Sequence, residues 1–256
     1  MDIFAVLGVV IGLGFILVAQ AIEGGNVGQL LQVTAAMIVF GGTAGAVIAS
    51  FPPADLKIAM SMTKDVLFPP KVNFESLISE IVGFAAKARK EGVIILEKEA
   101  KNASDPLLTM GLETVADGAD PSLVQGMMEN QITQLEEKVS KGAKVFESAG
   151  AYSPTLGIIG AVMGLIQVMQ NLSDPSKLGA GIAVAFVATV YGLFAANLIL
   201  LPISTRIKCN YQKLFIAKEM MLEGVLAIQA GESPTLIERK LNSFILVGTS
   251  SEGAKG

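Results

Sequence analysis

Few polar side chains interrupt the two long apolar stretches in the second half of this sequence, and those present are neutral near pH 7. They include hydroxyl, amide and phenol groups: Thr155, Gln167, Gln170, Thr189, Tyr191 and Asn197. Such groups can line part of a path for a small ion, but they are not the acids and bases that usually relay protons inside a membrane. Glu23 lies at the end of the first apolar stretch, where it would be in the interface. Any ion conducted here therefore needs a titrating group from a partner.

The remaining composition excludes several kinds of site. The chain has no His and one Cys, which rules out histidine metal sites, histidine proton relays, cysteine clusters and internal disulfides. Cys209 has no histidine to activate it, and no nucleophile–base pair or carboxylate dyad is visible. We therefore expect no enzyme activity, no metal and no cofactor. The modest net charge of -4 gives no indication of nucleic-acid binding.

Four apolar stretches are long enough to cross a bilayer. Hydrophobic residues make up 52% of the chain, its mean hydropathy is +0.58, and a helical span needs about 20 apolar residues. The predicted spans are residues 3–22, 30–51, 154–172 and 178–203. The linkers EGGNVGQ and SDPSK are short turns, so the spans form two hairpins, residues 1–51 and 153–203. We predict an all-α membrane protein with a large helical cytoplasmic domain, residues 52–152, and a cytoplasmic tail, residues 204–256.

The basic residues predict the orientation of these spans. Of the 19 basic residues, 11 lie between the two hairpins, 7 lie in the tail, and only Lys177 lies in a hairpin turn. Cytoplasmic loops carry an excess of Lys and Arg. The sequence therefore predicts that both termini, the long central segment and the tail are cytoplasmic.

The cytoplasmic segments are expected to be helical, with no strand pattern. Two capping residues each precede a proline at a first helical position: Asp105-Pro106 and Asp120-Pro121. We predict a helix near residues 73–100 and a long helix from Pro121 up to the membrane. The last span should continue into the tail as far as Gly231, and Ser233-Pro234 should start a final helix.

Small residues recur at four-residue spacing in the predicted spans, as in Gly160 and Gly164 or Ala188 and Gly192. This spacing lets helix backbones approach closely in lipid, where packing drives association. It is equally consistent with a passive helical scaffold that transports nothing.

Four motifs carry a resemblance to a known family. They are SPTLGIIGAVMGLI on the third span, FVATVYGLFAANLILLPI on the fourth, MLEGVLAIQAGESP in the tail, and ARKEGVIILEKEAK in the cytoplasmic segment. Together with the four-span topology they resemble the MotA/PomA family of flagellar stator subunits, along nearly the whole chain.

The resemblance implies a pore-forming subunit in the bacterial inner membrane. In this family a ring of A subunits, a pentamer, surrounds two helices of a MotB-type partner, a single-span subunit that binds peptidoglycan. The partner supplies the membrane aspartate that takes up the ion. Ion flow turns the ring, which drives the rotor through charged contacts with its FliG protein.

Five residues of the hairpin at residues 153–203 match family positions along the ion path. Pro154 and Pro202 match two prolines near the ends of the third and fourth spans. We expect Pro154 to start a helix, Pro202 to kink one, and both to act as hinges. Thr189 matches a hydroxyl that faces the partner's aspartate, although it could equally bond back to its own helix. Ala161 and Ala188 match threonines of sodium-driven relatives, so the resemblance favours H⁺ over Na⁺.

The resemblance also implies a set of rotor contacts. Arg89, Lys90 and Glu97 match the family's rotor-contact charges, and the predicted helix would put Lys90 and Glu97 on one face, seven residues apart. Some relatives have a second acid after the one matched by Glu97, where this chain has Lys98, so Glu99 is expected to share the acidic role. Without the resemblance, these charges would be read as a solvated helix face.

Two further interpretations stay open on the sequence. Glu147, just before the third span, is a possible cytoplasmic exit for the ion, although helix-end solvation explains it equally well. The TolQ/ExbB class, which uses the proton gradient to energise the envelope, is the alternative function. Members of that class have three spans and an external N-terminus, whereas four spans are predicted here.

Overall fold

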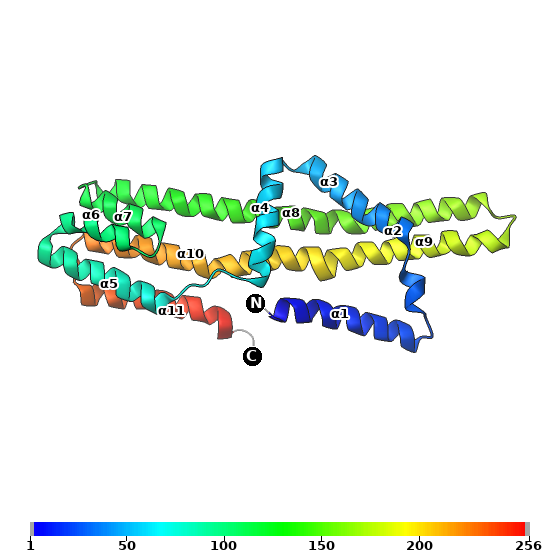
Figure 1. Ribbon diagram of the computed structural model, residues 1–256, viewed down its shortest axis with the longest axis horizontal. Helices are drawn as coiled ribbons and strands as arrows, with labels where there is room; N and C mark the ends of the chain where they lie inside the picture. Colours follow the sequence, from blue (N-terminus) through cyan, green and yellow to red (C-terminus); the bar gives the residue numbers. More distant parts are fainter. Residues whose placement is uncertain (1–2, 254–256) are drawn as a thin grey trace. The chain divides into compact units, whose positions relative to one another are not determined.

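The computed structural model describes the backbone of residues 3–253 and the side chains of residues 3–174 and 178–245, and every regular element within that backbone is a helix (Figure 1). The chain divides into two compact units. The first comprises Met1–Pro69 and Val139–Cys209, and the second comprises Pro70–Lys138 and Asn210–Gly256. The predicted all-α class is confirmed.

The first unit contains the N-terminal helices, which Figure 1 draws in blue and cyan. They are α1 (Ile3–Ile22), the 3-10 turn η1 (Val27–Leu30), α2 (Val33–Ala36), the π-helix η2 (Met37–Gly41), α3 (Gly42–Ser50) and α4 (Pro53–Leu67). α1 has the same bounds as the first predicted span. The second predicted span, residues 30–51, is helical from Val33 to Ser50 and changes its winding at η2.

Two long helices run through both units: α8 (Pro121–Gln170) and α10 (Leu201–Gln229). Between them lie α9 (Pro175–Phe194) and the π-helix η5 (Ala195–Leu200). The predicted long helix from Pro121 is present. Four helices in the described part of the chain are long and apolar enough to cross a membrane: Ile3–Ile22, Val33–Ser50, Pro121–Gln170 and Leu178–Gln229.

Pro154 does not start a helix as we predicted, because α8 continues through it. A proline inside a helix removes one backbone hydrogen bond, and neighbouring helices can compensate in a membrane bundle. Here α9 packs directly on this turn. A Cβ placed on Gly192 would lie 2.6 Å from the Ser153 carbonyl oxygen and 3.1 Å from the Pro154 Cα.

The second unit contains α5 (Phe74–Glu91), three short turns, α7 (Pro106–Ala116) and α11 (Pro234–Gly253), together with parts of α8 and α10. Side chains from all of these helices share one core, including Ile81, Leu108, Met128, Met220 and Leu241. The segments that we separated as cytoplasmic domain and tail therefore fold together. Asp105 caps α7 by accepting from the Leu107 N–H at 2.8 Å, and both of its carboxylate oxygens lie 2.6 Å from Lys218 Nζ.

The predicted helix over residues 73–100 is wrong in its second half. α5 ends at Glu91, because Gly92 has φ 84°, in the left-handed region that favours glycine. The chain then continues through three short turns: η3 (Val93–Ile95), α6 (Leu96–Glu99) and η4 (Ala100–Asn102). Lys90 and Glu97 therefore do not share a helix face, and our geometric argument for pairing them fails.

Candidate functional site

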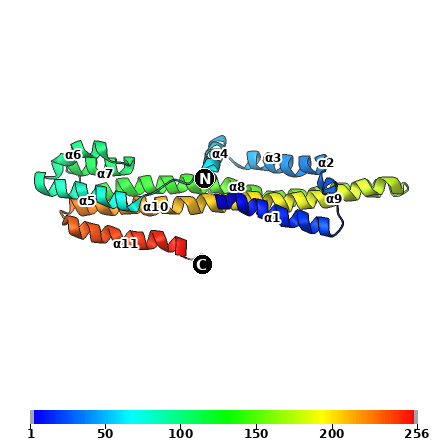
Figure 2. The same ribbon diagram turned by 60° about the horizontal axis from the view of Figure 1, so that its bottom comes forward.

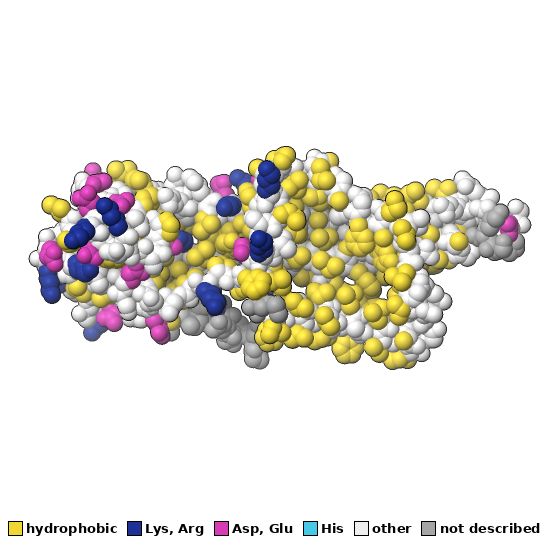
Figure 3. All heavy atoms as spheres, viewed as in Figure 1, with side chains coloured by type: hydrophobic (Ala, Val, Ile, Leu, Met, Phe, Trp, Pro, Cys, Tyr) yellow, Lys and Arg dark blue, Asp and Glu magenta, His cyan; other side chains and the backbone are white. Residues whose placement is uncertain are grey.

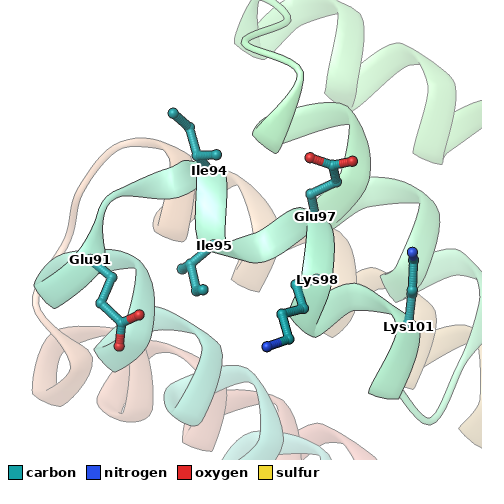
Figure 4. A pocket seen from close by; sticks show the side chains of 6 residues that line it. All are labelled: Glu91, Ile94, Ile95, Glu97, Lys98 and Lys101. Carbon is teal, nitrogen blue, oxygen red and sulfur yellow. The ribbon is translucent and has the colours of Figure 1, made fainter.

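The short turns after Gly92 present a cluster of charged and apolar side chains. Six of these line one shallow pocket: Glu91, Ile94, Ile95, Glu97, Lys98 and Lys101 (Figure 4). In that view Ile94 and Glu97 point to one side, whereas Glu91 and Lys98 point to the other. The break at Gly92 thus spreads the charges around the turn instead of stacking them along a helix.

The charges predicted to contact the rotor differ in their availability. Arg89, Lys90 and Glu97 are exposed, and none of them forms an ion pair with any residue of the described chain. Glu99 is instead bonded to Lys87 at 2.6 Å, and its side chain is only 18% exposed. The first three charges are free to meet a partner, whereas Glu99 ties α6 to α5.

An exposed isoleucine lies among these charges, and our sequence reasoning did not single it out. Ile94 is 74% exposed, and the neighbouring Val93 is also exposed. Exposed large apolar side chains next to charged ones are a common feature of protein-binding surfaces. The sequence signal was the apolar run Val93–Ile95 inside a charged segment directly after a glycine.

The predicted ion-path residues lie where α8 and α9 pack closely. A Cβ on Gly164 would lie 2.6 Å from the Gly181 carbonyl oxygen, so the two backbones are in direct contact. Ala188 is fully buried in the same interface, and Ala161 is half-buried. Small residues at this spacing therefore bring these helices together, as the sequence indicated.

The hydroxyl of Thr189 is bonded to its own helix. It donates to the Ala185 carbonyl oxygen at 3.2 Å, and the residue is half-buried. This is the local bond that the sequence left open as an alternative to a partner-facing role. A threonine in this state keeps a lone pair that can still accept a hydrogen bond.

Tyr191, which the sequence identified only as one polar residue of the fourth span, connects the two hairpins. Its hydroxyl donates to the Leu30 carbonyl oxygen at 2.5 Å and accepts from the Gln32 N–H at 3.3 Å. Its ring contacts Phe40 with centroids 5.9 Å apart. The chain entering α2 is thereby fixed to α9, a tertiary contact with no local sequence signal.

Pro202 lies two residues after the end of the π-helix η5 and is exposed. Proline cannot donate to the carbonyl four residues before it, and π-helical turns are common where a helix adapts to such a break or to a functional site. Ala195 and Ala196 of the same π-helix are buried. The sequence predicted a kink at Pro202, and the structure has a widened turn beside it.

Glu147 lies between two lysines, seven residues before Pro154 on α8. It accepts from Lys208 Nζ at 3.0 Å and from Lys144 Nζ at 3.1 Å. These bonds, the one from Lys208 above all, lower the pKa of the Glu147 carboxyl below its ordinary value of 4.5. The carboxylate is therefore ionised near neutral pH and is a poor acceptor for a proton. Among the residues with described positions, no group of three or more His, Cys, Asp or Glu could hold a metal ion.

Comparisons with known proteins agree with this arrangement. Residues 99–220 match the MotA/TolQ/ExbB proton channel family, and residues 6–92 match the Motility protein A N-terminal family. The second match covers most of the first hairpin, which lies outside the first match, and its Motility protein A family favours the flagellar class over the TolQ/ExbB alternative.

Three relatives match nearly the whole chain. YtxD of Bacillus subtilis is 35% identical, over 95% of this chain and 90% of the relative. Motility protein A of Helicobacter pylori is 33% identical, over 97% and 96%. The solved structure of C. jejuni MotAB superposes with a TM-score of 0.89 at 31% identity, over 95% of this chain and 96% of that one. The chain therefore belongs to the MotA family and is an ion-channel subunit of the flagellar stator, not an enzyme.

Proposed function

We propose that this subunit forms the wall of a proton path and that a MotB-type partner supplies the group that takes up the proton. The observation that carries the proposal is the close contact of α8 and α9, in which Ala188 is buried and Thr189 is bonded to Ala185. Sodium needs oxygen ligands in exchange for its hydration water. The path offers few of them, whereas a proton can pass through water to the partner's acid.

The proposed assembly is a homo-oligomeric ring, five copies around two partner helices. The solved C. jejuni neighbour is described as MotAB, which supports a MotB-type partner for this chain as well. We place the complex in the bacterial inner membrane with both termini in the cytoplasm. A reporter fused to the N-terminus should be active on the cytoplasmic side, and periplasmic activity would contradict this orientation.

The proposed rotor contact is the surface formed by Arg89, Lys90, Ile94 and Glu97, and its partner is FliG. The three charges are exposed and unpaired within the described chain, so binding a rotor would not require an existing ion pair to break. Charges at such a surface set encounter rate and register, while a central apolar side chain adds affinity.

Ion flux in vesicles tests the proposed path. The subunit is reconstituted alone and with its partner, and proton entry is followed with a pH-sensitive dye under an imposed gradient. We expect flux only when the partner is present and its membrane acid is intact. A strong proton leak through the subunit alone would show that the path needs no external titrating group.

A further inference from the structure

The helix α4 begins directly after the second candidate span and changes the direction of the chain. α3 ends at Ser50, Pro52 is extended with φ −59° and ψ 151°, and Pro53 is the first residue of α4. In Figure 1 α4 crosses α8 instead of running along it, and Figure 2 shows it against the same part of α8. Only Phe51 and Pro52 separate the candidate span from α4, so α4 begins next to the membrane surface if that span crosses the bilayer.

One face of α4 is packed against α8. Ala59, Met62 and Val66 are buried, and their spacing places them on one side of the helix. A Cβ placed on Gly142 of α8 would lie 2.5 Å from the Met62 sulfur and 3.7 Å from the Ala59 Cα, so the two helices are in close contact here. The opposite face of α4 is therefore the one that faces outward.

The outward face carries basic and apolar side chains and no acid. Lys57, Met60 and Lys64 follow one another at helical spacing, and Phe68 lies just beyond the end of the helix in the same line. Met60 is 69% exposed and Phe68 61%. We call these four residues the α4 stripe. In Figure 3 basic side chains lie over α4 among the hydrophobic side chains that continue onto α3.

The charges of α4 are distributed unequally. Lys57 and Lys64 are exposed, and neither forms an ion pair within the part of the chain that the structure describes. Asp55 is half-buried in the first turn, and Asp65 is half-buried and already has an interaction partner. The α4 stripe is thus purely positive, with Met60 between its two lysines.

We propose that the α4 stripe binds anionic phospholipid headgroups on the membrane surface next to the second span. Lysine stems cover apolar surface while their ammonium groups reach phosphates, and exposed apolar side chains between them insert into the headgroup region. Basic residues beside a span are attracted to anionic leaflets. The positive charge of the α4 stripe and its position next to the span indicate that its ligand is an anionic lipid. The proposal rests on the orientation proposed above, in which both termini are cytoplasmic.

Native mass spectrometry of the full-length protein, purified from membranes with its assembly intact, tests the proposal. Bound phosphatidylglycerol is compared with phosphatidylcholine of the same acyl chains. We expect preferential retention of phosphatidylglycerol. Lys57→Gln combined with Lys64→Gln should weaken it by about five-fold per lysine, or about thirty-fold in all. Lys57→Arg combined with Lys64→Arg should keep the preference for phosphatidylglycerol, because both charges remain. Met60→Ser should weaken lipid binding without changing the charge.

The matched control removes two exposed, unpaired positive charges of the second unit, in Lys101→Gln with Arg239→Gln. It should leave the lipid preference within about two-fold of the original, because neither residue belongs to the α4 stripe or lies in a candidate span. Equal loss in both double variants, or no loss in the stripe variant, would overturn the proposal. If the stripe variant instead sheds subunits with its lipid preference unchanged, the stripe contacts another copy and the proposal is also wrong. The readout requires no ion flux or rotation, so failure of the proposed function would be seen separately.

Discussion

Gly160 of α8 and Ala188 of α9 face each other so closely that a Cβ on Gly160 would lie 2.5 Å from the Ala188 methyl carbon. An added carbon on Gly160 would therefore clash with Ala188, which is itself fully buried. Ala188 is one of the two positions at which the family resemblance places a hydroxyl in sodium-driven relatives. In this chain its methyl group is part of the helix contact.

Ala188→Thr should therefore destabilise the packing of α9 on α8. Overpacking a well-packed core costs about 1 to 3 kcal/mol, so we expect a lower melting temperature of the purified protein. Ala161→Thr is the control, since Ala161 is half-buried and has more room. If Ala188→Thr melts like the unsubstituted protein while Ala161→Thr melts at a lower temperature, Ala188 is not the more tightly packed of the two residues and our description of the interface is wrong.

Arg89→Glu and Glu97→Lys should impair swimming without loss of protein from the membrane. Both side chains are exposed and unpaired within the described residues, and exposed charges contribute about 0 to 1 kcal/mol to stability. Swimming speed and membrane abundance are measured together, with Arg239→Glu on α11 as control. Disappearance of the two variants from the membrane would make these residues structural. Partial recovery with a reversed charge on FliG would support the rotor contact.

Ile94→Ser should reduce torque while leaving stability unchanged, because the side chain is exposed and its loss creates no cavity. Leu236→Ser on α11 removes another exposed apolar side chain of the same unit and should leave swimming unaffected. Torque is measured on tethered cells under increasing load. Equal torque in the Ile94 variant and the unsubstituted protein would exclude an apolar contribution to the rotor surface.

Local sequence signals predict much of this fold. The features that the sequence does not predict depend on the backbone conformation at one residue or on contacts between distant residues. The mostly apolar twenty-residue stretch of α1 predicts both ends of that helix, and Asp120-Pro121 predicts the start of α8. Gly92 is a local signal for a helix end, but the helical periodicity on both sides of it favours one continuous helix. The sequence therefore does not predict the turn that carries Glu97. The contact of Tyr191 with Leu30 joins residues 161 apart in sequence. No local pattern predicts such a contact.

Glu147→Gln should lower stability near neutral pH but change proton flux little. The pKa of Glu147 is lowered by Lys208 and Lys144, so its stabilising contribution is fully present above pH 4.5 and is lost as pH falls through its folded pKa. Melting temperatures of the two proteins should differ equally at pH 6 and pH 8 and converge below pH 4.5. A variant that melts normally but loses proton flux would instead assign Glu147 to the ion exit.

The dependence of rotation on sodium tests the central claim most directly. Cells whose only stator contains this subunit are tethered, and rotation is measured while sodium is removed at fixed proton-motive force, and then while a protonophore is added at high external pH with sodium present. We predict that rotation continues without sodium and stops with the protonophore, because the two positions at which the family resemblance places threonines in sodium-driven relatives carry only the methyl groups of Ala161 and Ala188, and sodium needs oxygen ligands in exchange for its hydration water. Rotation that stops when sodium is removed and survives the protonophore would contradict it.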